Sequence, residues 1–349
     1  MTLTELSYYS RKSLPFVIVF FLLLLLFFYA IKLLFMYLFS LSPKTVYTNP
    51  IFGKIQIPQI KNASNSAGFN FTLDTIEGTP ITASDTAKVY FLPPTAAKFG
   101  YSEKIYLMAK TFGFDTTIVK YKLNDVEAVF KDLKQKLTVD ITNFNFHYDY
   151  NFRQDTNLFT GATIPSQDTI QNKAIDFLTS VGRYPDELAK GKTNITYMHY
   201  DTVTRQLTNT DRPVDANVVE IDFFRPDIDG TAVVTPGFPS SQNYVVMVFH
   251  DEDFKVVRAQ IKFFEKSDAQ IGVYPLKTGD AAWKALQDGQ GIVMAPADAQ
   301  KNVTIKTMFL GYFDPDIYQS YLQPVFVFVG ENNFVAYVPA VANEYLTGE

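Results

Sequence analysis

One run of apolar residues, Leu14–Phe39, constrains this chain more than any other feature. The run has 26 residues, of which 21 are Leu, Phe, Val, Ile or Met, and its only charged residue is Lys32. A membrane-spanning helix needs about 20 apolar residues, and a buried helix of a soluble protein is rarely apolar on every face. Lys32 lies roughly 27 Å along a helix from Leu14, where its side chain can reach the far interface. The sequence therefore predicts a transmembrane helix over residues 14–39 that contacts the lipid bilayer.

A cleaved signal peptide is the alternative to a permanent anchor. The apolar core of a signal peptide usually has roughly 7–15 residues, which is much shorter than this run. Small residues follow at Ser40 and Ser42, but Pro43 would come directly after the cut, which is unfavourable. We therefore expect an uncleaved signal anchor.

The charges on the two sides of the span predict its orientation. Arg11 and Lys12 precede the span, so positive-inside bias places residues 1–13 in the cytoplasm as a short tail. Residues 40–349 then form an extracytoplasmic part, with 28 basic and 35 acidic side chains and a net charge of -7. The formal charge of the whole chain, -5, argues against nucleic acid as the main partner. The chain has no cysteine, which excludes disulfides, cysteine-ligated metal sites and thiol catalysis.

The extracytoplasmic part is predicted to begin with a stalk and continue with modules. Residues 40–86 contain Pro43, Pro50 and Pro58, which favour extended or irregular chain, so we interpret this segment as a stalk and lead-in. A short helix followed by strands then recurs three times. The three predicted modules are residues 87–160, 161–268 and 269–349. Whether the first two are separate domains or one continuous sheet stays open.

Three helices are predicted from apolar spacing and end signals. They cover roughly residues 95–112, 166–181 and 279–286. In the first, Ile105, Met108, Ala109 and Phe112 recur at helical spacing. Ser166 is a suitable N-cap for the second, which is expected to stop at Gly182.

The strand signals indicate antiparallel sheets. Residues 144–152 alternate aromatic side chains with polar ones, as in a half-buried strand. Residues 325–329 and 334–338 are apolar throughout, and residues 330–333 between them have a turn composition. We therefore predict a hairpin in a sheet that is covered on both faces. The fold class is α+β, with short helices packed on antiparallel sheets after the transmembrane helix.

The last module carries residues that resemble a known family. They are Ala281-Ala282-Trp283-Lys284-Ala285-Leu286, Asp288-Gly289-Gln290-Gly291, Leu310-Gly311-Tyr312-Phe313, Tyr321-Leu322-Gln323-Pro324-Val325-Phe326-Val327-Phe328 and Tyr337-Val338-Pro339-Ala340-Val341. This helix, strand and hairpin pattern resembles PepSY-like and YycI-like extracytoplasmic modules. The whole chain is also similar to single-pass membrane proteins of candidate-phylum bacteria. The resemblance implies a tethered protein that contacts a sensor kinase or accompanies an envelope protease, and it implies no catalytic residue.

Signatures of catalysis and of cofactor binding are missing from the sequence. There is no Gly-x-Ser-x-Gly, His-Glu-x-x-His, Walker or Gly-x-Gly-x-x-Gly motif. The three histidines, His147, His199 and His250, have no metal-ligand spacing. Acidic loops at 227–230, 250–253 and 314–316 are typical of turns rather than of calcium loops. We therefore expect no catalytic residue, no cofactor and no metal site.

Two features are candidates for recognition. Asn145, His147 and Asp149 share one face of the alternating strand, beside aromatic side chains, and form a possible ligand or partner face. A solvated outer face is the alternative for these residues. Trp283, the only tryptophan, is a possible packing anchor for its helix or an interface residue.

The function that follows is a membrane-anchored extracytoplasmic interaction or regulatory protein of the cell envelope, which is not an enzyme. Its expected partner is an envelope or membrane protein. The alternative is a module that binds a glycan or peptide in the envelope, and an envelope hydrolase with a dispersed carboxylate site is a third possibility.

Overall fold

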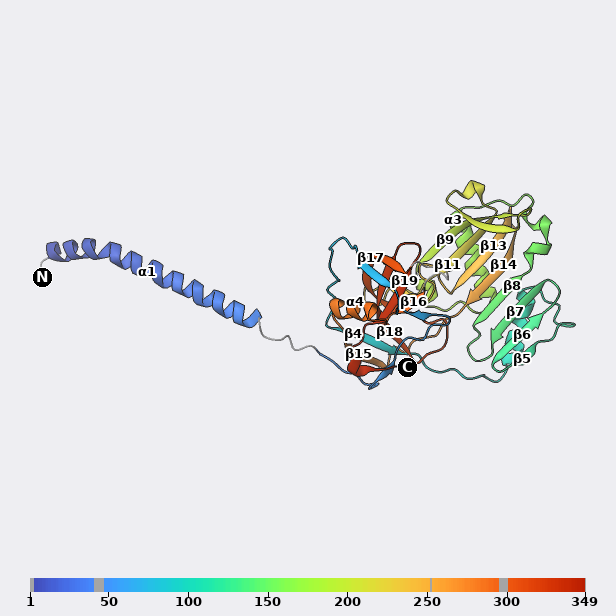
Figure 1. Ribbon diagram of the computed structural model, residues 1–349, viewed down its shortest axis with the longest axis horizontal. Helices are drawn as coiled ribbons and strands as arrows, with labels where there is room; N and C mark the ends of the chain where they lie inside the picture. The colour runs from blue at the N-terminus through green and yellow to red at the C-terminus, as the bar shows by residue number, and fades with distance from the viewer. Residues whose placement is uncertain (1–2, 41–46, 252, 295–300, 349) are drawn as a thin grey trace. The chain divides into compact units, whose positions relative to one another are not determined.

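The computed structural model describes residues 3–40, 47–251, 253–294 and 301–348, and the chain forms two compact units (Figure 1). The first unit, Met1–Tyr47, contains helix α1, Leu3–Ser40. Within α1, Leu14–Tyr37 is long and apolar enough to cross a membrane, and its side chains are exposed. The second unit, Thr48–Glu349, is called the folded unit below.

Nine antiparallel strands of the folded unit form one sheet in the order β10-β9-β11-β13-β14-β8-β7-β6-β5. Their bounds are β5 Lys122–Asn124, β6 Glu127–Lys131, β7 Gln135–Asp140, β8 Phe146–Tyr150, β9 Thr193–Asp201, β10 Gln206–Thr210, β11 Val218–Phe223, β13 Tyr244–His250 and β14 Asp253–Ile261. Strand β14 pairs with β8, with Ala259 opposite Tyr148. The first two predicted modules therefore contribute strands to a single continuous sheet.

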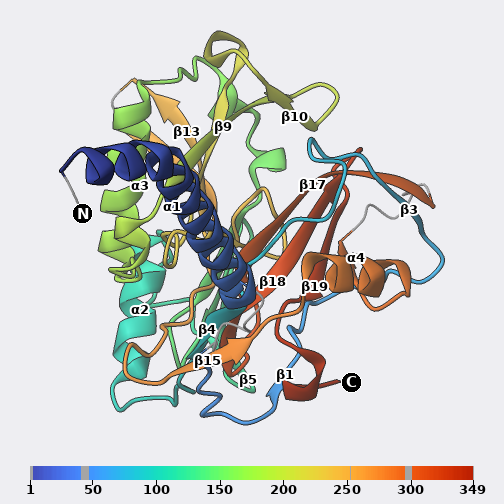
Figure 2. The same cartoon turned by 90° about the vertical axis from the view of Figure 1, so that its left-hand side faces the viewer.

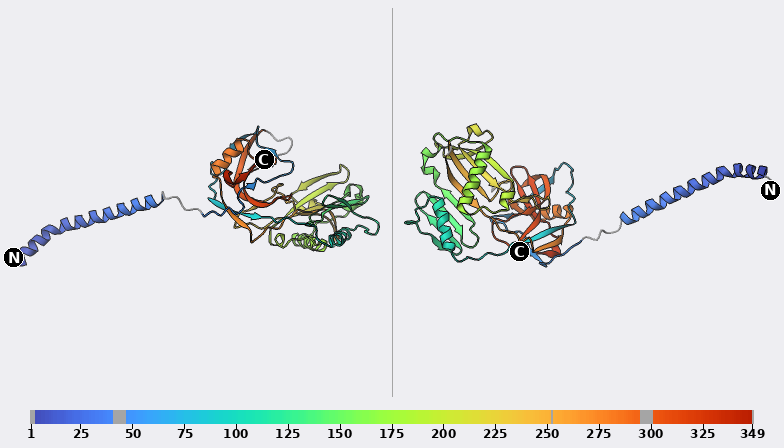
Figure 3. Two further views of the ribbon diagram at one scale, coloured as in Figure 1. Left: turned by 90° about the horizontal axis from the view of Figure 1, so that it is seen from below. Right: turned by 180° about the vertical axis from the view of Figure 1, so that it is seen from behind.

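Helices α2, Tyr101–Thr111, and α3, Gln167–Val181, cover one face of this sheet (Figure 3). The Ser166 hydroxyl accepts a hydrogen bond from the Thr169 N–H, and Gly182 ends α3 in the left-handed conformation that favours glycine. Both predicted ends of α3 are thus confirmed.

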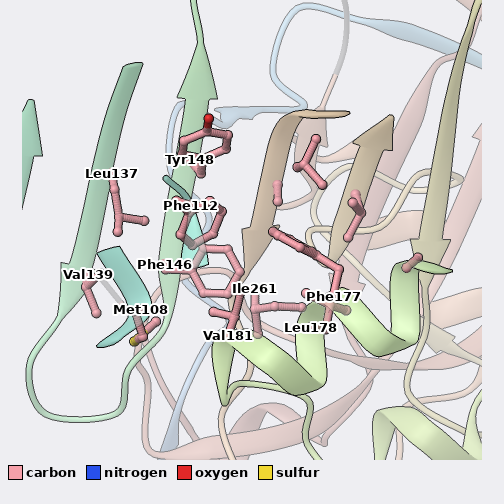
Figure 4. Packing of buried hydrophobic residues seen from close by; sticks show 14 of the residues in the cluster. Met108, Phe112, Leu137, Val139, Phe146, Tyr148, Phe177, Leu178, Val181 and Ile261 are labelled. Atoms are coloured by element: carbon pink, nitrogen blue, oxygen red, sulfur yellow. The ribbon is translucent and has the colours of Figure 1, made fainter. Parts of the chain in front are cut away.

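Phe112 of the segment after α2 packs edge-on against Phe146 of β8 and Phe177 of α3, with ring centroids 5.4 Å apart in each pair (Figure 4). The alternation along residues 144–152 supplies the sheet side of this core, because Phe146 and Tyr148 point toward the helices and are almost fully buried. The prediction of helices packed on an antiparallel sheet is confirmed.

A second sheet joins segments from both ends of the folded unit. Strands run in the order β12-β17-β18-β19-β16-β2, while β3 also pairs with β17, and β4 pairs with both β18 and β15. The bounds are β2 Ser64–Asn65, β3 Asn70–Leu73, β4 Thr86–Phe91, β12 Val233–Val234, β15 Ile271–Pro275, β16 Ile292–Met294, β17 Asn302–Phe313, β18 Tyr321–Gly330 and β19 Val335–Pro339. A small pair, β1 Ile55–Gln56 and β20 Leu346–Thr347, lies apart from this sheet, and helix α4 spans Gly279–Gln287.

Strands β18 and β19 form the predicted hairpin, and both faces of it are covered. On one face α4 contributes Ala282 and Leu286 to a core with Phe326 and Phe328, and Figure 2 shows α4 beside β19. On the other face, Ile60 and Phe238, which come from segments outside these strands, pack against a cluster that contains Tyr337. Burial on both faces explains why the two strands are apolar at successive positions.

Residues 48–86 differ from the expectation of a stalk. Their strands pair with the end of the chain: Ile55 lies opposite Leu346, and Asn70 lies opposite Asn302. The prolines limit regular structure to short strands, as predicted, but the distant partners cannot be recognised from local composition. This segment therefore belongs to the folded unit: β1 pairs with β20, and β2, β3 and β4 are strands of the second sheet.

A buried ion network connects the two sheets. Arg225, which follows β11, is 0% exposed, and its Nη1 lies 2.6 Å from Glu187 Oε2. Its Nε and Nη2 donate to Asp314 Oδ1 at 3.2 and 3.1 Å, and Nη2 also donates to the Phe264 carbonyl at 2.7 Å. The guanidinium lies 4.0 Å from the ring centroid of Phe263. Carboxylates, a carbonyl group and an aromatic ring therefore surround the guanidinium group of Arg225.

Candidate functional site

The face of the nine-stranded sheet opposite α2 and α3 is called the helix-free face. Strand alternation places His147 and Asp149 of β8 on it, because their neighbours Phe146 and Tyr148 point to the helix side. Residues directly opposite on β14 are Gln260 for His147 and Arg258 for Asp149. Two of the three predicted residues, His147 and Asp149, therefore share this face, and both are half-exposed. Arg258, a cation that the sequence did not assign to the site, lies beside them.

These side chains form a fixed polar chain. His147 Nε2 lies 2.6 Å from Asp149 Oδ2, and Arg258 Nε donates to Asp149 Oδ1 at 3.0 Å. The hydrogen bond from His147, together with that from Arg258, outweighs the effect of partial burial and lowers the pKa of Asp149 to about 2. Asp149 is therefore a permanent carboxylate with both oxygens engaged.

Asn145 has a different position and role. It is buried, and its Oδ1 accepts hydrogen bonds from Arg183 Nη2 at 2.8 Å and from the Phe263 N–H at 3.2 Å. These contacts connect the start of β8 to the end of β14 and to the residue after α3. The structure thus pairs His147 with Asp149, whereas Asn145, which lies in the lining of one pocket together with His147, uses its side-chain oxygen for structural hydrogen bonds.

A pocket of about 350 Å³ lies beside Asp149, at the turn end of the β6–β7 hairpin. We call it the basic pocket, because three lysines, two arginines and two aspartates line it. Its lining residues are Lys131, Asp132, Leu133, Lys134, Gln135, Lys136, Asp149, Tyr150, Asn151, Phe152, Arg153 and Arg258. The three lysines within residues 131–136 are a visible signal in the sequence, but no local pattern predicts that they line a pocket.

A second pocket, of about 280 Å³, lies beside His147, where the helix-free face meets residues 316–318. We call it the junction pocket. Lys262 and Asp316 form an ion pair of 3.6 Å in its lining, and Phe264 and Tyr318 add aromatic rings. His147 Nδ1 and Asp316 Oδ1 are buried without a hydrogen-bond partner among the described residues. Such atoms are costly when left unpaired, and they mark a place where a ligand or water completes the structure.

Two further acids extend the helix-free face on β11. Glu220 and Asp222 occupy alternate positions, so they point to the same side. Burial and the neighbouring charge of Glu220 raise the pKa of Asp222 to about 7, and burial also raises the pKa of Glu220. Asp222 is 1% exposed and accepts a hydrogen bond from the Ser241 N–H. A substrate does not reach this carboxyl group in the observed conformation.

Trp283 lies on α4 and faces the second sheet. It is half-buried, and its ring centroid is 6.0 Å from that of Phe328 and 6.4 Å from that of Phe71. Phe71 belongs to β3, so the tryptophan contacts both a C-terminal strand and a strand from the lead-in segment.

The acidic loops carry ion pairs. Asp227 binds Lys192 at 2.9 Å and Asp229 binds Lys88 at 2.8 Å. The loop at 250–253 lies partly outside the described residues. Within the described ranges, no three His, Asp or Glu side chains gather as metal ligands.

Comparison with known proteins gives limited similarity. No protein-family model matches the chain, and no curated protein matches its sequence. An uncharacterized protein from Eubacterium rectale is 10% identical, with a TM-score of 0.35 and 78% of this chain and 89% of that chain covered. The YpeB C-terminal domain from Bacillus megaterium is 11% identical, with a TM-score of 0.30 and coverage of 71% and 95%. Both TM-scores are below 0.5, so the resemblance to PepSY-like and YycI-like modules stays a prediction.

Proposed function

We propose that this chain is a non-catalytic interaction protein of the cell envelope, anchored in the cell membrane by residues 14–39. The observation that carries the proposal is the helix-free face. One face of the nine-stranded sheet is covered by α2 and α3, whereas the other carries a polar chain between two pockets. Phe152 and Phe159 cover the part of this face on β9, β11 and β13 with an apolar cluster, whereas the stretch around His147 and Asp149 stays half-exposed. A half-exposed polar stretch between two pockets is suited to a partner.

The geometry of the polar chain supports binding rather than proton transfer. A general base that works near neutral pH needs a pKa near that pH, and the pKa of Asp149 is about 2. Both of its oxygens are held by His147 and Arg258, which fixes their positions. Fixed charges of this kind give a docking surface its register and specificity.

The partner that fits this proposal is a membrane or envelope protein. The membrane helix keeps the folded unit close to the membrane, and the resemblance of residues 281–341 to PepSY-like and YycI-like modules implies a sensor kinase or an envelope protease. Because no catalytic motif occurs in the sequence, the proposed role is regulation of such a partner by contact.

Site-specific photo-crosslinking in intact cells tests this proposal. A photoreactive side chain replaces Thr138, which lies opposite His147 on the helix-free face. The matched control replaces Asp176, an exposed residue of α3. We expect one recurrent envelope protein to crosslink from position 138 and not from position 176, and the yield to fall in a His147→Ala/Asp149→Ala variant. Equal crosslinking from both positions, or none, contradicts the proposal.

The proposed orientation has its own test, because the chain contains no cysteine. Single cysteines replace Ser7, before the span, and Lys110, an exposed residue of α2. In intact cells a membrane-impermeant maleimide should label only the second variant. Retention of residues 1–39 in the mature protein, measured by mass, separates a permanent anchor from a cleaved signal peptide.

Binding of a glycan or peptide is a second candidate function, which the junction pocket favours. Its two aromatic rings and the buried unpaired atoms of His147 and Asp316 suit a small ligand that carries hydrogen-bond donors. Substitution of both His147 and Asp149 should abolish such binding without unfolding the protein. Unchanged binding of the ligand removes this face from consideration.

A further inference from the structure

The β6–β7 hairpin contains an unfavourable pairing of charges. Lys131 and Lys136 lie directly opposite each other in the antiparallel ladder, and Lys134 lies in the turn that connects the two strands. Like charges at directly opposite positions destabilise an antiparallel pair. None of the three lysines forms an ion pair within the described parts of the chain. A hairpin selected for stability alone would not place them together.

The fold brings further cations to the same place. Arg153 follows β8 and forms no ion pair with any described residue, and Arg258 reaches the pocket from β14. Lys255 lies 4.7 Å from the ring centroid of Tyr150, which also lines the pocket. Burial lowers the pKa of Lys255, while the charge of Asp155 raises it and that of Lys134 lowers it. Positive charge is thus concentrated in an extracytoplasmic part whose net charge is -7.

Both acids in the lining are already engaged. Asp132 Oδ1 accepts the backbone N–H groups of Lys134 and Gln135 at 2.7 and 2.9 Å, and its Oδ2 accepts from Gln135 Nε2 at 3.1 Å. Asp149 is held between His147 and Arg258. Asp132 is therefore held by uncharged groups of its own turn, and Asp149, which lies opposite Lys136 on β8, is paired with Arg258. Neither carboxylate forms an ion pair with the three lysines, and the five cations of the lining outnumber its two acids.

We propose that the basic pocket binds a phosphate group. Three lysines, whose ammonium groups are compact charges, line a concave site of about 350 Å³ that is open to solvent, which suits a multiply charged oxyanion. The bound anion offsets the repulsion between Lys131 and Lys136. Two sources carry this chemistry outside the membrane: free inorganic phosphate and the phosphodiester units of an anionic polymer. This inference does not depend on a protein partner at the helix-free face.

Calorimetric titration of the full-length protein in neutral detergent at low salt tests the proposal. The probes are inorganic phosphate and a glycerol-phosphate oligomer, each titrated separately. The test variant changes Lys131, Lys134 and Lys136 to Gln. Each cation close to an anionic group contributes about fivefold to affinity, so we expect about a 100-fold loss. The matched control changes three exposed lysines elsewhere, Lys54, Lys110 and Lys301, to Gln and should retain binding.

A thermal measurement separates this role from a purely structural one. Without an anion, the pocket variant should unfold at the same or a higher temperature than the unmodified protein, because the repulsion has been removed. With phosphate or the oligomer, the unmodified protein should gain stability and the pocket variant should not. A pocket variant that is less stable without an anion contradicts the proposal.

The two probes distinguish the source of the phosphate group. Binding of inorganic phosphate with no gain from the oligomer indicates a free anion. Oligomer binding that is at least tenfold tighter and weakens steeply with salt indicates a polymer. If neither probe binds, or if the control variant loses as much affinity as the pocket variant, the inference is wrong. Such a result would not change the outcome expected from photo-crosslinking at position 138, because that experiment tests the proposed function separately.

Discussion

Replacement of Arg225 by methionine is a sharp test of how the two sheets are held together. The substitution keeps an apolar stem of similar length but removes the guanidinium. Asp314, whose side chain is 2% exposed, then loses both hydrogen bonds from Arg225 at a position that is closed to solvent. Glu187 is 23% exposed and can turn toward solvent. The loss of unfolding free energy therefore comes mainly from the unpaired carboxylate of Asp314.

The expected loss is about 3–5 kcal/mol at neutral pH, which is typical when one partner of a buried ion pair is removed. Burial raises the pKa of Asp314, whereas Arg225 acts in the opposite direction. Without Arg225, the pKa in the folded state lies well above the value of about 3.9 in the unfolded state. The folded variant then binds a proton more tightly than the unfolded chain. Its deficit is small below the unfolded pKa and grows as the pH rises toward the folded pKa.

The assay is urea unfolding of the full-length protein in detergent, at several pH values from acidic to neutral. Trp283 is the only tryptophan, so its fluorescence reports the second sheet, while tyrosine circular dichroism reports both sheets. The control is Arg212→Met, in an exposed pair with Asp215, for which we expect a change within about 0.5 kcal/mol. Adding Asp314→Leu to Arg225→Met should recover most of the loss. A loss below about 1 kcal/mol, or one that is independent of pH, refutes this reasoning.

Three other substitutions test separate features. Gly191→Ala should cost about 3 kcal/mol or more in unfolding free energy, because the new Cβ would lie 1.7 Å from the Phe224 carbonyl oxygen. Burial raises the pKa of the Asp222 carboxyl to about 7 in the folded state only, so the unmodified protein should lose stability as the pH rises from about 4 to about 7. Asp222→Asn should remove this loss. Trp283→Ala should cost about 3 kcal/mol, since the half-buried ring packs against Phe71 and Phe328. Chemical denaturation of each variant, repeated across pH for Asp222→Asn, measures these effects.

Local signals in the sequence predicted the elements that depend on neighbouring residues. Ser166 and Gly182 indicated the ends of α3, and the apolar stretches around residues 330–333 indicated the β18–β19 hairpin. Each of these features depends on hydrogen bonds or burial within a short segment. Periodicity and end signals are therefore sufficient to find them.

Pairing between distant segments could not be predicted in the same way. The contact of β14 with β8 depends on two edges that match only after each hairpin has formed. Residues 55–56 pair in parallel with residues 346–347, and nothing in either dipeptide identifies its partner. For the described residues 47–86, proline content correctly indicated little regular structure but could not indicate pairing with distant strands.

Within the candidate site, the sequence predicted only the residues whose shared face follows from the alternation of side chains along one strand. His147 and Asp149 share a face because they are two residues apart on one strand. Arg258 and Asp316 come from other strands and loops, so their approach to these residues depends on the fold. The lysines at 131, 134 and 136 were visible in the sequence. Their significance depends on the register that places Lys131 opposite Lys136.

The division of the second sheet between both ends of the folded unit sets an order of assembly. The nine-stranded sheet and its two helices are complete once residues 101–261 have been synthesised. Strands β1 to β3, made earlier, must wait for partners that are made last. During synthesis these early strands have unpaired edges, which favour aggregation, and closure over so long a loop is slow. We therefore expect the central sheet to fold first as an independent nucleus, and the second sheet to close around its two flanks in a later, rate-limiting step.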